Sequence, residues 1–202
     1  VNEEPNISPR PFYFADLRVD PEWPNRLYRL DYGVRVSDDG GKTFRALEGA
    51  RALHGDFHAM WIDPTDGRRM YTGDDGGIGE SRDRGATMRF VTNLPLAQFY
   101  HVAVDDAEPY NVMGGMQDNG SWRGPAAPFE EGGIRNHMWR LVGGGDGYNV
   151  LPDPAAPETG YSMWQGGNLM RFDLAAGTSR PVRPPPPEGV QRRVNWNSAL
   201  AL

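Results

Sequence analysis

The chain has 202 residues, of which 38% are hydrophobic and 24% are charged, a composition typical of a folded globular protein. Its net charge of −6 argues against nucleic acid as a partner. No apolar run approaches the roughly 18 residues that a membrane-spanning helix needs. The sequence contains no cysteine, which excludes disulfides, thiol catalysis and cysteine-ligated zinc. With 26 glycines and 18 prolines, it predicts many short strands joined by turns.

One pattern of strands and turns recurs four times along the chain. Each repeat has an apolar strand, a turn that contains an aspartate, a second short strand, and a third strand that follows a glycine. A period of about 40 to 50 residues with about four strands is typical of the blades of a β-propeller. The turn aspartates, at spacings of 43, 42 and 48 residues, are Asp20, Asp63, Asp105 and Asp153.

We therefore predict an all-β fold, a β-propeller fragment with about four blades of a propeller that has seven or more. Because the chain begins with Val1 rather than Met, and its last four residues resemble an interrupted strand, we expect it to be part of a longer protein. The predicted blades span residues 11–52, 53–96, 97–142 and 143–193, and residues 194–202 start a next blade.

Two segments, 37–44 and 81–88, share the pattern S-x-D-x-G-x-T followed by a large apolar residue. Serine and aspartate side chains can bond to the backbone of their own turn, and glycine allows a positive φ. The final apolar residue is expected to be buried between sheets. The predicted structural residues are Ser37, Asp39, Gly41, Thr43 and Phe44 in the first segment, and Ser81, Asp83, Gly85 and Thr87 in the second.

This pattern resembles the Asp-box, or BNR repeat, of sialidases, xyloglucanase-type glycosidases and the sortilin (Vps10) ectodomain. The first segment matches in full, whereas Met88 takes the place of the usual aromatic residue in the second. Three longer stretches, 58–64, 115–122 and 143–147, resemble a bacterial family of secreted, sortilin-like "glycosyl hydrolase" propellers. The resemblance implies a propeller fold and a secreted or periplasmic location.

The alternation of strands predicts where a ligand would bind. In each blade, the loop that leads into the first strand and the turn between the second and third strands share one end, opposite the Asp-box hairpin. Converging polar and aromatic side chains at such a rim favour a ligand site, although a rim that holds only water is the alternative. The predicted ligand-binding residues are Asp56, His58, Gln98, Tyr100, Asn119, Gln165 and Asn195.

Two short motifs allow more than one interpretation. His54, Asp56 and His58 alternate, so on a strand they would share one face and could hold a metal or form a His–Asp pair. We expect the pair and no metal. The glycine-rich run 143–147 lacks the lysine and the following helix of a phosphate loop, so we expect it to let the backbone pass close to the channel axis or a ligand. No cofactor is predicted.

The predicted function is an extracytoplasmic module that binds a glycan or a peptide at the rim. The alternative is a glycoside hydrolase, which needs two carboxylates about 5–5.5 Å apart for retention or 6.5–9.5 Å for inversion. A sialidase is disfavoured because three rim arginines cannot be assembled, and an assembly or sorting scaffold is a third hypothesis. The predicted partners are this ligand and the remaining blades of the same propeller. The candidate catalytic residues are Asp75, Asp118 and Asp146, with Asp146 paired to one of the others.

Overall fold

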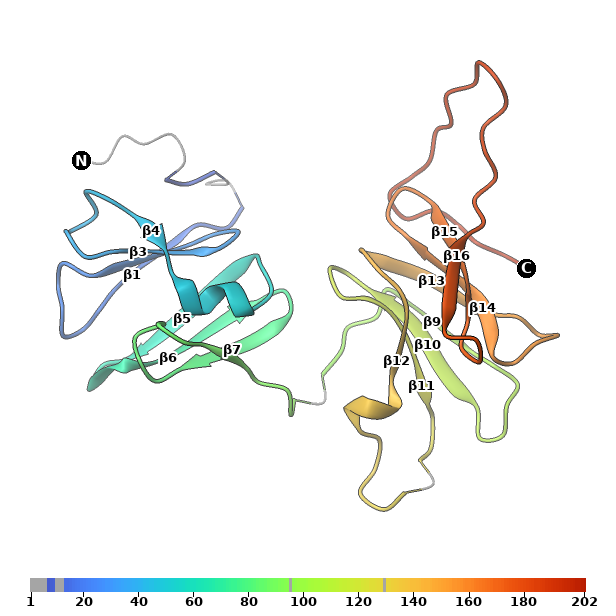
Figure 1. Cartoon of the computed structure of the whole chain (residues 1–202), viewed down its shortest axis with the longest axis horizontal. Coiled ribbons are helices and arrows are strands. Elements are labelled where there is room, and N and C mark those ends of the chain that lie inside the picture. The colour runs from blue at the N-terminus through green and yellow to red at the C-terminus, as the bar shows by residue number, and fades with distance from the viewer. Residues whose placement is uncertain (1–6, 10–12, 95, 129) are drawn as a thin grey trace. The chain divides into compact units, whose positions relative to one another are not determined.

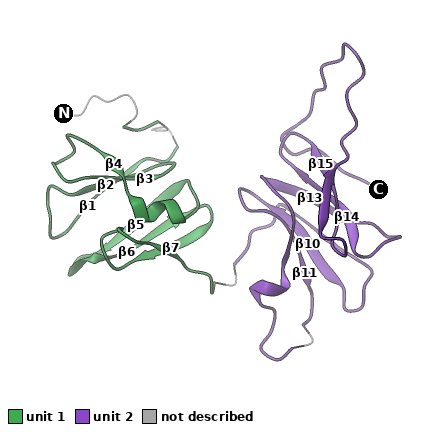
Figure 2. Cartoon of the chain, in the orientation of Figure 1, with its two compact units in different colours: residues 1–94 green, residues 95–202 purple. Residues whose placement is uncertain are grey.

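The computed structural model describes residues 7–9, 13–94, 96–128 and 130–202, and it divides into two compact units, residues 1–94 and 95–202 (Figures 1 and 2). Residues 11 and 12, the predicted start of the first blade, lie outside the described residues. The predicted fold class is confirmed, because the described residues form four separate four-stranded antiparallel sheets. The strands of each sheet follow one another in chain order, as they do in a propeller blade.

Unit 1 contains two of these sheets and a short 3-10 helix, η1, at Glu48–Ala52 between them. The first sheet comprises β1 (Asp16–Val19), β2 (Leu27–Leu30), β3 (Val34–Ser37) and β4 (Arg45–Ala46). The second comprises β5 (Phe57–Asp63), β6 (Asp66–Asp74), β7 (Gly77–Ser81) and β8 (Arg89–Phe90).

Unit 2 also contains two sheets, and its three-residue 3-10 helix, η2 at Asn136–Met138, lies between the third and fourth strands of the first of them. Its first sheet comprises β9 (His101–Val104), β10 (Asn111–Met116), β11 (Gly120–Pro125) and β12 (Arg140–Gly143). Its second comprises β13 (Gly147–Pro152), β14 (Thr159–Trp164), β15 (Asn168–Asp173) and β16 (Thr178–Pro181). The described residues contain no helix with the length and hydropathy that crossing a bilayer requires.

In each unit, the hydrophobic core lies between the two sheets. Tyr28 and Val36 of the first sheet and Met60 and Met70 of the second are buried in one cluster in unit 1. In unit 2, Met113 and Val142 are buried with Val150 and Phe172 of the following sheet. A single sheet of this size has two faces to cover, so each pair of sheets stabilises itself by burying one face of each.

The repeated turn aspartates are structural groups. Asp20, which is 1% exposed, accepts hydrogen bonds from the backbone N–H groups of Glu22 and Trp23. Asp105 in unit 2 is also buried and accepts bonds from the N–H groups of Ala107 and Asn111. A carboxylate that satisfies the donors of its own turn explains why this residue recurs at the start of each β-hairpin loop.

Both Asp-box-like hairpins contain the local hydrogen bonds that their sequence predicts. Ser37 Oγ accepts from the N–H of Gly41 at 2.8 Å, while Asp39 accepts from the N–H and the hydroxyl of Thr43 at 2.9 and 2.7 Å. The second hairpin repeats the set, with Ser81 Oγ bound by Gly85 N–H and Asp83 bound by the N–H and hydroxyl of Thr87. Their polar groups are therefore engaged within the turns themselves.

The predicted burial of the apolar residue holds for Met88 and only in part for Phe44. Met88 is 8% exposed, whereas Phe44 is of intermediate exposure. The η1 segment covers the second hairpin, since Gly49 N–H donates to Gly85 O and a side chain at position 49 would collide with the backbone at Met88. Met88 belongs to the same buried cluster as Leu47 and Ala50.

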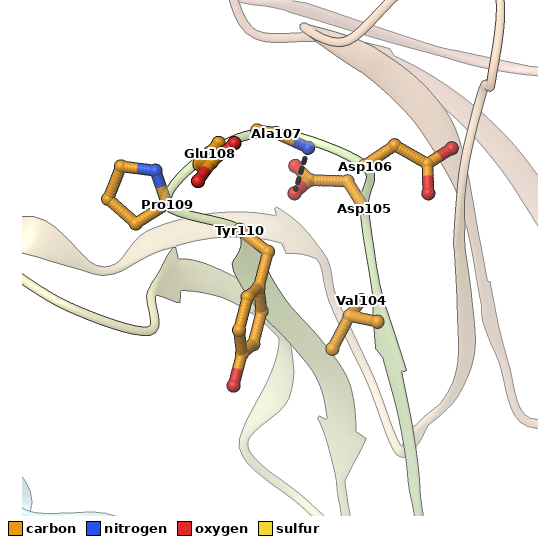
Figure 3. Close-up of a pocket in the computed structure, with 7 residues that line it drawn as sticks. All are labelled: Val104, Asp105, Asp106, Ala107, Glu108, Pro109 and Tyr110. Carbon is orange, nitrogen blue, oxygen red and sulfur yellow. Dashed lines mark hydrogen bonds between the residues drawn. The ribbon is translucent and has the colours of Figure 1, made fainter.

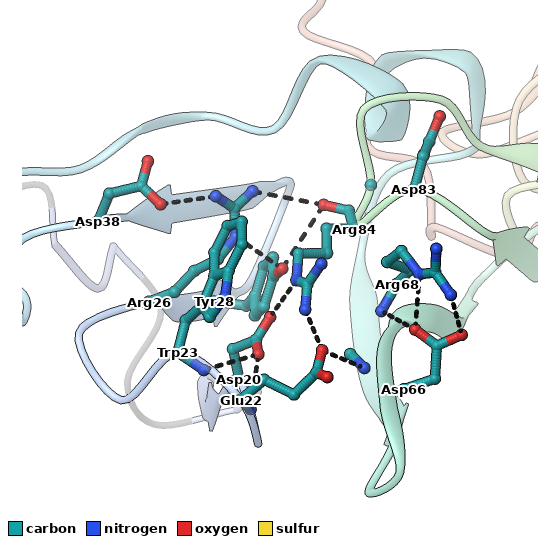
Figure 4. Close-up of polar contacts among 12 residues, drawn as sticks. Asp20, Glu22, Trp23, Arg26, Tyr28, Asp38, Asp66, Arg68, Asp83 and Arg84 are labelled. Atoms are coloured by element: carbon teal, nitrogen blue, oxygen red, sulfur yellow. Dashed lines mark hydrogen bonds and ion pairs between the residues drawn. The ribbon is translucent and has the colours of Figure 1, made fainter.

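An ionic network joins the two sheets of unit 1 at the end that carries these hairpins (Figure 4). Arg84, at φ +60° in the second hairpin, donates to the Asp20 carboxylate at 3.1 Å and also to Glu22. Its guanidinium lies 4.0 Å from the centre of the Trp23 ring. Arg26 completes the first sheet's side of the network by pairing with Asp38 at 2.6 Å. Arg84 therefore connects the turns of two successive sheets.

Candidate functional site

The loops at the rim end of each unit are fixed by backbone hydrogen bonds between successive sheets. Asp56 and Phe57, which lead into β5, donate their N–H groups to the carbonyl oxygens of Tyr32 and Asp31 in the β2–β3 turn. In unit 2, Gly120 N–H donates to Gly145 O, which joins the β10–β11 turn to the loop before β13. The backbone alone therefore holds each of these rim loops to the neighbouring sheet.

In unit 1, the rim contains a His–Asp pair with aromatic neighbours. His58 Nε2 lies 2.7 Å from Asp75 Oδ1, which agrees with the His–Asp interpretation of this region, although the partner of His58 is Asp75 and not Asp56. The His58 ring packs against Phe14 and Tyr13, with ring centres 4.6 and 6.0 Å apart. The pair is partly exposed, so it remains accessible to a ligand.

The expectation that His54, Asp56 and His58 share one strand face is wrong. Asp56 precedes β5 and has a left-handed backbone with φ +62°. The pairing of β5 with β6 shifts register between Phe57 and Ala59, so His58 lies in a bulge. Bulges of this kind redirect a side chain, which is why simple alternation fails here. Within the described residues, no group of three or more His, Cys, Asp or Glu side chains is arranged to hold a metal ion.

The carboxyl group of Asp74, beside Asp75 in the β6–β7 turn, is the rim carboxyl of unit 1 with a raised pKa. Burial raises the pKa of Asp74, and the neighbouring Asp75 raises it further. Hydrogen bonds from the N–H groups of Gly76 and Gly77 lower it, but by less. Its Oδ1 accepts both of those bonds, at 2.9 and 3.0 Å. Its Oδ2 is buried and has no hydrogen-bond partner among the described residues.

In unit 2, the carboxylate of Asp146 joins two separate segments. Its Oδ1 accepts the backbone N–H of Asp118 at 3.0 Å, and its Oδ2 accepts the indole N–H of Trp196 at 2.9 Å. The backbone N–H of Asp146 is itself held by Gln165 Oε1 at 2.7 Å. The Asp118 backbone has φ +57°, which directs its N–H group within the tight β10–β11 turn. Both oxygens of Asp146 are thus occupied by hydrogen bonds.

Residues 194–198 form no strand, yet they contact the rim at several points. Gly166 N–H donates to Trp196 O at 3.0 Å, and Asn149 Nδ2 donates to Ser198 O at 3.0 Å. Asn197 Nδ2 lies 3.0 Å from His101 Nε2. Asn195 contributes its carbonyl oxygen to the hydroxyl of Ser198. This segment meets the β14–β15 turn much as residues 145 and 146 meet the β10–β11 turn.

Two tyrosines lie beside this network. The rings of Tyr100 and Tyr148 are stacked, with centres 4.8 Å apart, and the Tyr100 hydroxyl donates to Gln117 Oε1 at 2.6 Å. Tyr148 is only 4% exposed, whereas Tyr100 is 45% exposed. Burial raises the pKa of Tyr148, and Tyr100, Asp146 and Asp118 raise it further.

The predicted site residues fall into two sets, one in each unit. Unit 1 holds Asp56, His58 and Asp75, and unit 2 brings together Tyr100, Asp118, Asn119, Asp146 and Gln165, with Asn195 next to Trp196. Gln98 is exposed in the segment that precedes β9. That both sets line one rim stays a prediction.

Sequence reasoning missed Trp196, which is 63% exposed and lies at the centre of the contacts in unit 2. Its neighbour Asn195 was predicted as a ligand-binding residue of the rim. The available signal was an aromatic residue between two amides, at the place in its repeat that Gly145 takes in the repeat before.

Two glycines of the run 143–147 lie against neighbouring groups. A Cβ atom at position 147 would lie 2.3 Å from Gly120 O, and one at position 145 would lie 2.4 Å from Gln165 Oε1. In contrast, Gly144 has open space around it. Gly145 and Gly147 therefore allow close packing within unit 2, and the passage of this backbone beside a channel axis or ligand stays a prediction.

The hollow shown in Figure 3 lies at the opposite end of the β9–β10 pair and has a volume of about 530 Å³. Its lining comes from one loop, residues 104–110. Asp105 uses its carboxylate to bind Ala107 N–H, Asn111 and Arg123. A hollow formed by a single loop, with its buried carboxylate already bound, offers fewer converging groups than the rim.

Comparisons with known proteins were made at the levels of sequence and structure. No protein-family model matches the chain, and a search of curated proteins finds no significant relative. In structure, the chain is similar to the GH74 xyloglucanase of Xanthomonas campestris, with 18% identity over 83% of this chain and 29% of that one, at a TM-score of 0.34.

Two further solved structures show similarity of the same order. The GH74 enzyme of Niastella koreensis shares 14% identity over 82% of this chain and 29% of its own, at a TM-score of 0.35. The extracellular domain of a hybrid two-component system from B. thetaiotaomicron shares 13% identity over 90% of this chain and 22% of its own, at a TM-score of 0.31. The chain spans less than a third of these proteins. At such scores they add nothing to the assignment of an activity.

Proposed function

We propose that the chain is part of an extracytoplasmic β-propeller module that binds a glycan at the rim of unit 2. The observation that carries this proposal is the exposure of two aromatic rings, Tyr100 and Trp196, in the hydrogen-bonded network of Gln117 and Asp146. An aromatic ring presents an apolar face and a polar edge, which suits a ligand with C–H faces and hydroxyl groups. Polar groups held by their own partners then orient the ligand.

The hydrogen bonds of Asp146 bear on the choice between binding and hydrolysis at this place. A catalytic carboxylate must exchange a proton or attack a sugar carbon, which requires an accessible oxygen. Asp146 accepts a backbone N–H on one oxygen and an indole N–H on the other, which leaves each oxygen one further acceptor site for a substrate. The predicted catalytic pair of Asp146 with Asp118 therefore stays a hypothesis beside a binding role for the same loops. The pairing of Asp146 with Asp75 joins two units and stays a hypothesis.

The proposal is tested by binding measurements with the purified chain. Isothermal titration with a panel of neutral and acidic hexasaccharides should give at least one saturable interaction, and Tyr100→Ala should weaken it about tenfold, since exposed aromatic anchors carry much of a binding energy. Val190→Ala, an exposed apolar residue outside the rim network, serves as the control. Binding that is unchanged by Tyr100→Ala would count against the site.

A second candidate function, glycoside hydrolysis, is supported by one observation in unit 1. Asp74 and Asp75 are adjacent carboxyl groups in unlike environments, because Asp75 is partly exposed and contacts His58, whereas Asp74 is partly buried and burial raises its pKa. Asp74 Oδ1 accepts two turn N–H groups and its Oδ2 is buried, so Asp75 is the more accessible of the two. If this pair is catalytic, Asp74→Asn and Asp75→Asn should each abolish release of reducing sugar from a polysaccharide panel. Turnover by both variants at the wild-type rate would exclude the pair.

The Asp-box relationship and the wider propeller belong to the same proposal. The hydrogen bonds of the hairpins at residues 37–44 and 81–88 support an Asp-box assignment. The contacts of residues 194–198 with the β14–β15 turn support their role as the start of a next blade, and further blades are then partners of this chain. A secreted or periplasmic location follows from the same resemblance, and a peptide remains the alternative ligand.

A further inference from the structure

The network around Asp146 has a feature that the proposed function alone does not explain. Each oxygen of the Asp146 carboxylate already accepts one proton donor of the protein. One of those donors, the indole N–H of Trp196, comes from a segment 50 residues away in the chain. The indole ring is nevertheless 63% exposed. The bond therefore fixes the ring without burying it.

We propose that Asp146 is a positioning residue that holds the Trp196 indole as an aromatic platform for a neutral saccharide. This inference rests on the proposed function and names the class of its ligand. The bond at Nε1 and the bond from Gly166 N–H to Trp196 O hold the residue at its side chain and at its backbone. A ring fixed in this way loses less conformational entropy when a ligand stacks on it.

Asp146 is itself held in place for this role. Gln165 Oε1 accepts its backbone N–H at 2.7 Å, and Gly120 N–H donates to the carbonyl oxygen of the preceding Gly145 at 3.0 Å. Gln165 and Gly120 belong to two different turns, so the backbone at Asp146 is held from both of them. A side chain that orients another group needs such support from its surroundings.

The acidic groups of this network disfavour an anionic ligand on the platform. Asp146 binds the indole directly, and Asp118 is joined to the same carboxylate through its backbone N–H. Of the basic residues nearby, Arg183 donates to Asn168 Oδ1 at 3.4 Å, and Arg192 and Arg193 precede Trp196 in its segment. A uronic acid or a sulfated sugar stacked on Trp196 would bring a further negative charge to this region, and like charges repel at short distance. A neutral sugar meets no such penalty.

The first arm of the test needs no ligand. In the ¹⁵N-labelled chain, the indole N–H resonance of Trp196 is assigned by its loss in Trp196→Phe. Asn at position 146 has one acceptor oxygen in place of two, so Asp146→Asn cannot keep both bonds and should shift this resonance. Asp106→Asn removes the same charge from an exposed loop position and should leave the resonance in place. An unshifted resonance in Asp146→Asn would overturn the tether.

The second arm measures affinity by calorimetry with cellohexaose, mannohexaose and maltohexaose as neutral probes and hexagalacturonate as the acidic probe. We expect a neutral probe to bind at least about tenfold more tightly than hexagalacturonate, Trp196→Ala to lose about tenfold in affinity, and Asp146→Asn to lose about threefold. Undiminished binding by Trp196→Ala, or tighter binding of hexagalacturonate, would overturn the inference and leave the proposed function standing. If neither these hexasaccharides nor the wider panel binds the wild type, the proposed function fails, whereas the indole result still decides the tether.

Discussion

At the scale of single residues, the aspartates of this chain fall into groups with opposite electrostatics. Hydrogen bonds from the N–H and hydroxyl of Thr43, and from Ser37, hold the pKa of Asp39 far below its usual value. For Asp105, burial opposes the shift, but bonds from Asn111 and Arg123 still hold the pKa low. The pKa of Asp74 is instead raised, because the hydrogen bonds of its turn do not offset the effect of burial. In the sequence, Asp39, Asp105 and Asp74 are all aspartates of turns, and only the partners seen in the structure distinguish them.

The lowered pKa values predict acid sensitivity. A carboxyl group whose folded pKa lies below its unfolded value, about 3.8, adds stability above that value and loses it as pH falls through the folded pKa. The melting temperature should therefore fall as pH is lowered below about 4. Asp39→Asn should be less stable than wild type at neutral pH, and the difference should shrink in acid. A difference between the two melting temperatures that is constant with pH would contradict this assignment.

At the scale of elements, close contacts between neighbouring turns depend on missing side chains. Gly147 lies against Gly120 O, while Gly144, three residues earlier, has open surroundings. Gly147→Ala should lower the free energy of unfolding by about 1–3 kcal/mol, the usual range for overpacking. Gly144→Ala is the matched control and should be close to neutral. Chemical denaturation measures both, and equal effects would show that the contact at position 147 is unimportant.

The connection between the sheets of unit 1 gives a second prediction at this scale. Arg84 neutralises Asp20, whose carboxylate is fully buried. Arg84→Ala leaves that carboxylate without its guanidinium partner and should cost about 3 kcal/mol. Arg68→Ala removes an exposed arginine that pairs with Asp66 on the same β-hairpin and should cost well under 1 kcal/mol. Thermal unfolding compares the two, and equal losses would rule out a special role for Arg84.

The elements were largely predictable, and the side-chain arrangement at the rim was not. The turn aspartates and the S-x-D-x-G-x-T segments define the β-hairpins because their interactions are local in sequence. The bulge at His58 interrupts an alternation that the spacing alone implies. The bond between Trp196 and Asp146 joins residues that are 50 positions apart, so no local sequence pattern predicts it. Motifs with internal partners can be interpreted from sequence, whereas sites assembled from distant loops need coordinates.

At the scale of the whole molecule, each unit consists of two sheets packed face to face with one end made of local hairpins and the other of rim loops. The two ends differ in chemistry. The hairpin end uses its polar groups within turns or in ion pairs between sheets. The rim end of unit 2 joins the exposed rings of Tyr100 and Trp196 to hydrogen-bonded amide and carboxylate side chains. This asymmetry is the reason for assigning ligand binding to the rim.

The most direct measurement of this claim is a map of backbone amide and indole chemical shifts during titration of the ¹⁵N-labelled chain with the neutral hexasaccharide that binds best. The largest changes should occur at residues 100, 117–119, 145–147 and 194–198. The hairpins at residues 37–44 and 81–88 should not respond. Changes centred on those hairpins, or on the hollow at residues 104–110, with an unresponsive Trp196 indole, would contradict the assignment of the site.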